Sequence, residues 1–375
     1  MTVLPSSDSH SRANHPGRVF GLDLMRFVAI GLVLLCHMML AMRFCFRSSV
    51  GYAVMAGYFG VEIFFVLSGF LIGGILIRDF SAGATFGNLS RFWERRWLRT
   101  LPLFYLFLVI NLWVNTACGE PTTGWWKCAL FLQNLTGPPG AFFTEAWSLS
   151  IEEWFYLLAP ALIFLLTASG LTVKRAVLVA GSVGLVCATA WRIYFVITRN
   201  PDSLSGVRPV VMLRLDACMF GVLAAWWRHY APASWSRWAG AKLAGGILCL
   251  LAAAWMFRFL PLNSSFAART HFYTLTSLGA ALCLPALTSL RSSGGNLAGG
   301  VTFISKWSYA MYLVNFLIFA WLARQAGEGL VEPVTAAVAA STGLLLTVVA
   351  SAAIHYIYET PILRWRDRRL REPAS

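Results

Sequence analysis

About ten apolar runs follow one another along this 375-residue chain, and most are long enough to cross a lipid bilayer. A membrane-spanning helix needs about 20 mainly apolar residues. The runs lack the strict alternation of apolar and polar residues that indicates strands, so we expect an all-α fold, a polytopic transmembrane helical bundle of about ten spans. The expected spans are residues 20–42, 58–77, 97–117, 153–168, 176–198, 210–227, 239–260, 272–290, 303–323 and 332–357.

The composition excludes a soluble protein of this size. Hydrophobic residues make up 58% of the chain and charged residues 12%, a balance that a single water-soluble domain would not keep dispersed. The polar N-terminus lacks the basic start, short apolar segment and cleavage site of a signal peptide. We therefore expect a cytoplasmic N-terminal tail (residues 1–19), one transmembrane domain (residues 20–357) and a basic cytoplasmic C-terminal tail (residues 358–375).

The net charge of +14 indicates membrane topology rather than nucleic-acid binding. The basic residues stand at the ends of apolar runs instead of on one amphipathic surface. With the N-terminus inside, the cytoplasmic side carries 19 Lys and Arg residues and the outer side eight, which predicts that both termini are cytoplasmic. We find no internal repeat, which disfavours transporters built from two related halves.

The eight cysteines do not form a metal-binding pattern. No C-x-x-C pair occurs, and most of the cysteines lie inside apolar runs, where a thiol behaves as a small hydrophobic group. We therefore expect no metal site and no bound cofactor. Cys118 and Cys128 fall in one proposed outer loop and could form a disulfide, although two reduced thiols are favoured.

Arg26 and His37 form the first candidate site, because they share one face of the first expected helix. Their separation of 11 positions corresponds to three turns plus about 20° of rotation and a rise of roughly 16 Å. Glu62 in the second span has a depth similar to that of His37, and a carboxylate there would orient the imidazole and stabilise its protonated form. The alternatives are a snorkelling Arg26, a core histidine and an interfacial Glu62 that faces water.

Ser68 and Gly69 lie deeper in the second span. The serine hydroxyl could bond the backbone, and the glycine admits close approach of a helix or of an extended ligand. Packing is the favoured role of each residue taken alone.

Arg95, Arg96 and Arg99 stand in a tryptophan-containing segment before the third span, on the proposed cytoplasmic side. Such a cluster ordinarily sets the orientation of the protein and binds lipid phosphate. Guanidinium groups mixed with tryptophans also suit a donor that carries phosphates and an adenine ring.

The start of the fourth span approaches the membrane from the outer side, with acidic residues in its first turn. Compensation of the helix dipole is the simplest account of Glu152. Glu152 could instead accept a hydrogen bond from a sugar or another hydroxyl compound, and Trp147 and Tyr156 could stack on sugar faces. Ser148 and Ser150 are possible nucleophiles, but no spacing to a histidine identifies either.

Taken together, these residues resemble the acyltransferase 3 family of integral membrane acyltransferases. The family hallmarks are an arginine and a histidine separated by ten residues, a Phe-Phe-x-x-Ser-Gly segment, an Arg-Arg-x-x-Arg-x-x-Pro loop and a Trp-Ser-Leu-x-x-Glu segment. Here they are Arg26 with His37, residues 64–69, residues 95–102 and residues 147–152. The resemblance continues more weakly to residues 358–361 and covers nearly the whole chain.

The resemblance implies transfer of an acyl group, commonly acetyl, from cytoplasmic acyl-CoA to a hydroxyl of a carbohydrate, glycolipid or small molecule in a bacterial inner membrane. Its expected donor-binding residues are Arg26, Ser68, Gly69, Arg95, Arg96 and Arg99. Its expected catalytic residues are His37 as the base, with Glu62 or Glu152 orienting it. Its expected acceptor-binding residues are Trp147, Ser148, Ser150 and Tyr156.

One departure from the family pattern is Asn315, which stands where the family commonly has a histidine and which cannot transfer a proton. The sequence identifies no partner protein and no nucleic acid as a ligand. A function from another class is also open: a proton-coupled carrier or flippase that uses Arg26, His37 and Glu62 as a relay across the bilayer.

Overall fold

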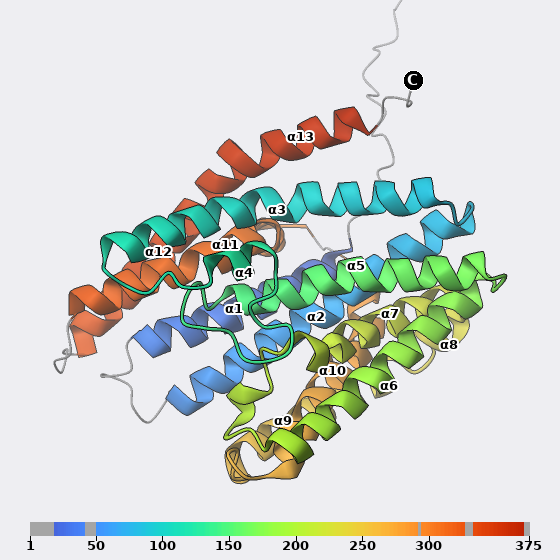
Figure 1. Ribbon diagram of the computed structural model, residues 1–375, viewed down its shortest axis with the longest axis horizontal. Helices are drawn as coiled ribbons and strands as arrows, with labels where there is room; N and C mark the ends of the chain where they lie inside the picture. Colours follow the sequence, from blue (N-terminus) through green and yellow to red (C-terminus); the bar gives the residue numbers. More distant parts are fainter. Residues whose placement is uncertain (1–18, 42–49, 292–293, 327–332, 371–375) are drawn as a thin grey trace, which may run out of the picture.

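The computed structural model describes residues 19–41, 50–291, 294–326 and 333–370, and every regular element within these ranges is helical (Figure 1). The long helices are α1 (Phe20–Ala41), α2 (Val50–Ser81), α3 (Phe86–Ala117), α5 (Ala146–Ala168), α6 (Val173–Arg199), α7 (Leu215–Tyr230), α9 (Ala239–Phe259), α10 (Phe266–Ser289), α11 (Asn296–Ala326) and α12 (Pro333–Ile354). The shorter ones are α4 (Trp125–Ala129), η2 (Leu204–Gly206), η3 (Val211–Leu213), α8 (Pro232–Ser236), the π-helical turn η4 (His355–Glu359) and α13 (Thr360–Arg369). The predicted all-α bundle is confirmed.

Nine helical segments in the described ranges are long and apolar enough to cross a membrane, so the chain is an integral multi-pass membrane protein. The sixth expected span, residues 210–227, is not among these nine. It contains η3 and the 16-residue helix α7, which is about 24 Å long and shorter than a hydrocarbon core of about 30 Å. The fourth expected span begins earlier than predicted, at Ala146, so that the Trp147 segment forms its first turns.

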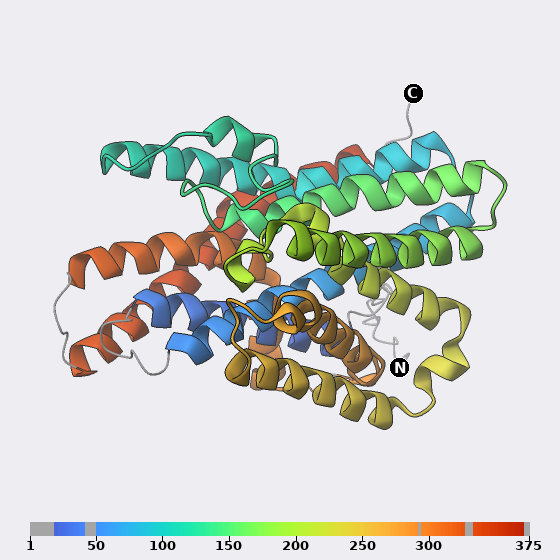
Figure 2. The ribbon, with the colours of Figure 1, turned by 60° about the horizontal axis from the view of Figure 1, so that its bottom comes forward.

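The connections between helices gather at two ends of the bundle (Figures 1 and 2). Segments 82–85, 169–172 and 231–238 lie at one end, and segments 118–145 and 260–265 lie at the other. This alternation agrees with the predicted order of spans. It also places α4 and its flanking loops at the end that the charge asymmetry predicts to be outside.

Two glycines allow α2 and α7 to pack with their backbones in contact. A Cβ atom on Gly69 would lie 1.9 Å from the carbonyl oxygen of Cys218, and one on Gly221 would lie 2.1 Å from that of Val66. Small residues of this kind let membrane helices approach closely. Gly69, which the family resemblance expects to bind the donor, faces α7 in the structure.

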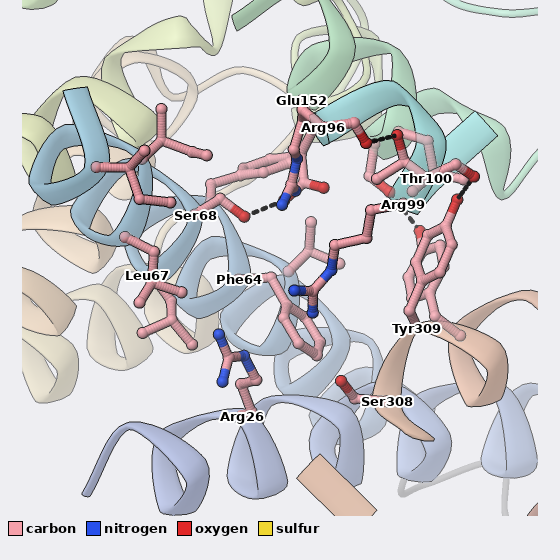
Figure 3. A pocket seen from close by; sticks show the side chains of 18 residues that line it. Arg26, Phe64, Leu67, Ser68, Arg96, Arg99, Thr100, Glu152, Ser308 and Tyr309 are labelled. Atoms are coloured by element: carbon pink, nitrogen blue, oxygen red, sulfur yellow. Dashed lines mark hydrogen bonds between the residues drawn. The ribbon is translucent and has the colours of Figure 1, made fainter. Parts of the chain in front are cut away.

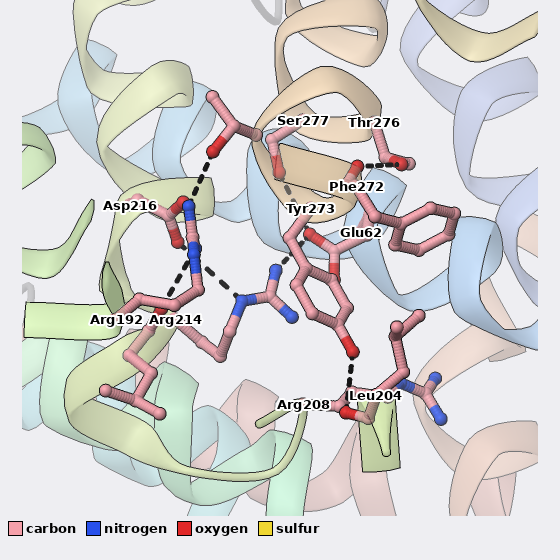
Figure 4. Close-up of polar contacts among 12 residues, drawn as sticks. Glu62, Arg192, Leu204, Arg208, Arg214, Asp216, Phe272, Tyr273, Thr276 and Ser277 are labelled. Atoms are coloured by element: carbon pink, nitrogen blue, oxygen red, sulfur yellow. Dashed lines mark hydrogen bonds and ion pairs between the residues drawn. The ribbon is translucent and has the colours of Figure 1, made fainter. Parts of the chain in front are cut away.

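A buried charge network joins four helices in the interior (Figure 4). Arg214 donates to Glu62 of α2 at 2.5 Å, and Arg192 of α6 donates to Asp216 of α7 at 2.7 Å. The four charged side chains are fully buried, and Ser277 of α10 donates a further hydrogen bond to Glu62 at 2.9 Å. Two positive and two negative charges balance, which makes burial in the bundle tolerable.

The two loop cysteines are free thiols in different surroundings, as the sequence favours. Cys118 is exposed, and Arg324 donates to its sulfur at 3.0 Å. Cys128 is buried beneath the loop that follows α4. Burial raises the pKa of the Cys128 thiol to about 11, and the neighbouring Glu145 carboxylate adds to the shift.

Candidate active site

A cavity of 240 Å³ opens between α1, α2, α3, α5 and α11, and we call it the arginine cavity. Figure 3 shows the side chains of Arg26, Arg96 and Arg99 directed into this space from two different helices. The only acidic side chain among the described residues that line it is Glu152. Three guanidinium groups against one carboxylate give the cavity a net positive charge, which favours an anionic ligand. Its polar lining is Arg26, Ser68, Arg96, Arg99, Thr100, Ser148, Glu152, Ser308, Tyr309 and Tyr312.

Arg96 is held in place by an aromatic ring and a chain of hydroxyl groups. Its guanidinium carbon lies 3.8 Å from the ring centroid of Tyr156, and it donates a hydrogen bond to the Tyr156 hydroxyl. That hydroxyl donates to Ser68 at 3.4 Å, and Ser68 donates to Glu152 at 2.5 Å. Because each group orients the next, the guanidinium is preorganised before any ligand enters.

Arg26 is oriented from its own helix. Asp23, one turn earlier on α1, lies 3.5 Å from the Arg26 guanidinium. Ser305 of α11 donates to the same carboxylate oxygen at 2.9 Å. The carboxylate thus fixes the arginine and joins α1 to α11 at the wall of the cavity.

A second cavity, of 120 Å³, lies farther along α1, and we call it the histidine cavity. Its walls come from α1, α2, α11, the start of α5 with the segment before it, and the segment before α7. The lining residues are Val33, Cys36, His37, Gly57, Val61, Thr144, Glu145, Trp147, Arg208, Tyr312 and Phe316.

His37 contacts α11 on one side of this cavity. Its Nδ1 lies 2.5 Å from the side-chain oxygen of Asn315, and the ring packs edge-on against Phe316 with centroids 5.5 Å apart. Asn315 is fully buried. The imidazole is therefore fixed by a hydrogen bond and an aromatic contact from the same helix.

Arg208 brings a positive charge into the histidine cavity. Its guanidinium carbon lies 4.0 Å from the ring centroid of Tyr58 and 4.6 Å from that of Trp147, and it donates to the backbone carbonyl of Gly57 at 3.0 Å. Contacts with two aromatic rings restrain the guanidinium. Arg208 thus places a positive charge in the cavity that His37 lines.

Val61 and Tyr312 line both cavities, so the two spaces adjoin. The Tyr312 hydroxyl donates to the backbone carbonyl of Glu145 at 3.1 Å and lies 2.6 Å from the Ser148 hydroxyl. A ligand that filled the arginine cavity would therefore contact the Tyr312 side chain, which also lines the space around His37.

The structure does not bring the two predicted carboxylates to His37. Glu62 is held in the buried network by Arg214, and Glu152 accepts from Ser68 and lines the arginine cavity. Neither carboxylate lines the cavity that holds His37. The described side chain that bonds the imidazole is Asn315.

Several other predicted residues lie elsewhere than expected. Arg95 is exposed and does not line the arginine cavity, whereas Arg96 and Arg99 do. Of the predicted acceptor residues, Trp147 lines the histidine cavity and Ser148 lines the arginine cavity. The other two, Ser150 and Tyr156, are fully buried; Ser150 bonds Gln133 at 2.6 Å, and Tyr156 supports Arg96.

Arg208 is one of several cavity residues that the sequence patterns do not indicate. It lies in the irregular segment between η2 and η3, outside the four family motifs. In the sequence it is a single basic residue in an expected outer loop, and it contributes there only to the count of outer-side charges. Only the aromatic contacts to Tyr58 and Trp147 distinguish it from an ordinary surface arginine.

The fold and the two cavities describe an integral membrane protein with an internal site that combines guanidinium groups and an imidazole. The chain matches the model of the Acyl_transf_3 family, described as an acyltransferase domain, over residues 19–356. It belongs to this acyltransferase family, and it is an enzyme that transfers acyl groups. No solved structure matches it.

Curated relatives carry consistent names. The chain is 25% identical to acyltransferase MdmB of Streptomyces mycarofaciens, over 94% of this chain and 93% of that protein. It is 28% identical to peptidoglycan O-acetyltransferase OatA of Listeria monocytogenes over 39% of this chain, and 31% identical to O-acetyltransferase OatA of Staphylococcus aureus over 28% of it. The matched parts are only 26% and 20% of the two OatA proteins.

Proposed function

We propose that this membrane O-acyltransferase takes an acyl group, in the simplest case acetyl, from acyl-CoA and transfers it to a hydroxyl of a carbohydrate or a small hydroxylated molecule. The observation that carries the proposal is the junction of the arginine cavity with the histidine cavity. One space suits the phosphates of the donor, and the other suits the acceptor.

The proposed donor site rests on the positive charge of the arginine cavity and on its position beside the histidine cavity. Arg26, Arg96 and Arg99 supply three guanidinium groups, and planar guanidinium forks bind phosphate oxygens through paired hydrogen bonds. The apolar side chains of the same wall suit the uncharged arm that links the phosphates to the thioester. In this arrangement the thioester would reach toward Tyr312, where the two cavities adjoin.

The transfer step needs one proton acceptor and one group that stabilises negative charge. His37 would take the proton of the acceptor hydroxyl as its oxygen bonds the thioester carbonyl carbon. Arg208 would stabilise the negative charge that develops on the carbonyl oxygen. The carbon–sulfur bond then breaks, and the CoA thiolate takes up the proton from the imidazolium. A thioester is already activated, so positioning, a base and charge stabilisation suffice.

The proposed acceptor class rests on two features. The histidine cavity holds Trp147, and aromatic rings commonly stack on sugar faces. The matched relatives include proteins named for O-acetylation of peptidoglycan, whose glycan strands carry hydroxyl groups. The carrier alternative loses support, because Glu62 bonds Arg214 instead of continuing a relay from His37.

Acyl-CoA titration of the purified protein in lipid nanodiscs tests the donor site. Arg96→Gln and Arg99→Gln should each raise the apparent Kd for acetyl-CoA about 10- to 100-fold, because each removes a charged hydrogen bond worth about 1.5–3 kcal/mol. Arg95→Gln is the matched control from the same helix and should bind as the wild type does. Equal binding by all three variants would reject the arginine cavity as the donor site.

Loss of the base tests the transfer step. His37→Ala should lower kcat by about 10²- to 10⁴-fold with radiolabelled acetyl-CoA and soluble peptidoglycan fragments, the usual contribution of a positioned base. Its acetyl-CoA affinity should stay within about twofold of wild type, since His37 lies outside the arginine cavity. Near-normal turnover in a well-folded variant would exclude His37 as the base.

The orientation of the donor site is tested with single-cysteine variants, from which the native cysteines have been removed, by labelling intact cells with an impermeant thiol reagent. The charge asymmetry predicts that Gly83→Cys is protected and Thr123→Cys is labelled, because segments 82–85 and 118–145 lie at opposite ends of the bundle. Labelling of position 83 but not 123 would reverse the orientation and exclude a cytoplasmic donor.

A further inference from the structure

We propose that Asn315 is a positioning residue that fixes the tautomer of His37, so that Nδ1 carries the hydrogen and Nε2 is the basic nitrogen. The inference deepens the proposed function, because it rests on His37 acting as the base. It assigns a role to the one position at which the chain departs from the family pattern.

The orientation of the Asn315 amide follows from its own hydrogen bonds. Its side-chain nitrogen lies 2.6 Å from the carbonyl oxygen of Met311 and 2.7 Å from that of Tyr312. Carbonyl oxygens only accept hydrogen bonds, so the NH₂ group must face them. The opposite orientation would place the amide oxygen against two carbonyl oxygens and leave the side chain with two repulsive contacts.

This orientation determines what His37 can do. The remaining side-chain atom of Asn315 is the amide oxygen, an obligatory acceptor, and it lies 2.5 Å from Nδ1 of His37. Nδ1 must therefore donate. In a neutral imidazole the other nitrogen, Nε2, then keeps the lone pair that can take a proton.

The surroundings explain why a neutral group is suited to this position. The charged or titratable side chains that line the cavity with His37 are Cys36, Glu145, Arg208 and Tyr312. The lining residues of α2, Gly57 and Val61, do not titrate. An amide orients the ring without adding a charge of its own, so the cation supplied by Arg208 remains available for the developing oxyanion.

A histidine at position 315 would act differently, because its own tautomer would have to be set before it could accept from His37. Asparagine presents a permanent acceptor, and its two backbone contacts fix that acceptor within one turn of α11. The same device, a residue that holds a catalytic imidazole in one tautomer, is used by the third member of hydrolase triads.

The tautomer itself is measured without an activity assay. Protein labelled with ¹⁵N-histidine gives different nitrogen shifts for the two neutral tautomers, and a His37→Gln sample identifies the His37 signals. We expect a protonated Nδ1 and an unprotonated Nε2 at a pH where the ring is neutral. The opposite tautomer in the wild-type protein would overturn the proposal, whatever the enzyme's activity.

Kinetics test the consequence for catalysis. Asn315→Leu should lower kcat about 10- to 100-fold, the loss that follows when the hydrogen-bonding partner of a metal-bound histidine, which orients its ring in the same way, is removed. The KM for acetyl-CoA should stay within about twofold of wild type. Asn315→Asp should move the acid limb of the pH–rate profile upward by about 1 to 3 pH units, because a carboxylate beside Nδ1 stabilises the protonated ring. A pH shift of this kind is not expected from a packing residue.

Asn111→Leu is the matched control, since Asn111 is also buried and bonds a carbonyl of its own helix, Phe107, at 2.9 Å. It should leave the pH profile unchanged. Wild-type kcat in Asn315→Leu, or an unmoved acid limb in Asn315→Asp, would reject the positioning role. Absence of acyl-CoA-dependent transfer in the wild type would instead reject the proposed function, and the tautomer measurement would still decide the role of Asn315.

Discussion

Replacement of Glu62 by leucine tests whether the buried charge network stabilises the fold, because the structure gives this carboxylate a structural role. Glu62 accepts hydrogen bonds from Arg214 at 2.5 Å and from Ser277 at 2.9 Å. Without it, Arg192 and Arg214 would share the single carboxylate of Asp216, and the fully buried cluster would carry a net charge of +1. Breaking one partner of a buried ion pair typically destabilises a protein by about 3–5 kcal/mol.

The matching double variant separates the loss of the pair from the loss of the side chain. Glu62→Leu with Arg214→Leu removes both charges and restores electrical balance, because Arg192 keeps its contact to Asp216 at 2.7 Å. We expect the double variant to recover at least about 2 kcal/mol of the stability lost in Glu62→Leu, a coupling within the range measured for residues in contact.

The assay is reversible unfolding of the purified protein in bicelles, followed by tryptophan fluorescence. A Glu62→Leu variant within about 0.5 kcal/mol of wild type would refute the argument, since that is the range of an unimportant surface change. Activity adds a second criterion. If the double variant folds but shows the same loss of turnover as His37→Ala, Glu62 acts on the imidazole after all.

Three further outcomes are expected. Gly69→Leu should prevent accumulation in the membrane, because its Cβ would lie 1.9 Å from the α7 backbone. Gly74→Leu is the control and should accumulate normally, because a Cβ there would meet nothing within 4 Å. Comparable amounts of the two variants would refute the close crossing of α2 and α7. The Cys128 thiol, with its pKa raised to about 11, is mostly protonated at pH 8. Its alkylation rate at pH 8 should therefore be far lower than that of the exposed Cys118, and the rate should increase with pH. Equal alkylation rates would contradict the burial of Cys128. Tyr312→Phe should lower the melting temperature, because the Glu145 carbonyl and the Ser148 hydroxyl would lose their hydrogen-bond partner. The expected loss in the free energy of unfolding is about 1–3 kcal/mol. An unchanged melting temperature would refute these two hydrogen bonds.

The helical bundle could be predicted from the sequence because it depends on a local property. A run of about 20 apolar residues must form its backbone hydrogen bonds within itself wherever it enters lipid. Helix boundaries were less certain where polar residues begin a span. The helix containing Trp147 therefore started earlier than expected, and the region around Arg214 became a 3₁₀ turn followed by a short helix.

The candidate site also has a part that the sequence predicts and a part that only the tertiary structure shows. The spacing of Arg26 and His37 along one helix is fixed by helix geometry, and the two residues do line adjoining cavities. Depth in the membrane suggested Glu62 as the partner of His37, but depth gives no information on which way a side chain points around the helix axis. The tertiary packing turns Glu62 toward Arg214.

The sequence by itself thus determined the class of fold, the membrane setting, the family resemblance and the residues that carry charge into the bilayer. Only the tertiary structure decided which of those residues meet: it gave His37 a partner 278 positions away in Asn315, brought Arg208 into the cavity and placed Arg95 outside it. The physical reason is that apolarity and helical period are properties of one segment. A hydrogen bond between two helices depends on their rotation and crossing, which the packing of all the helices sets together.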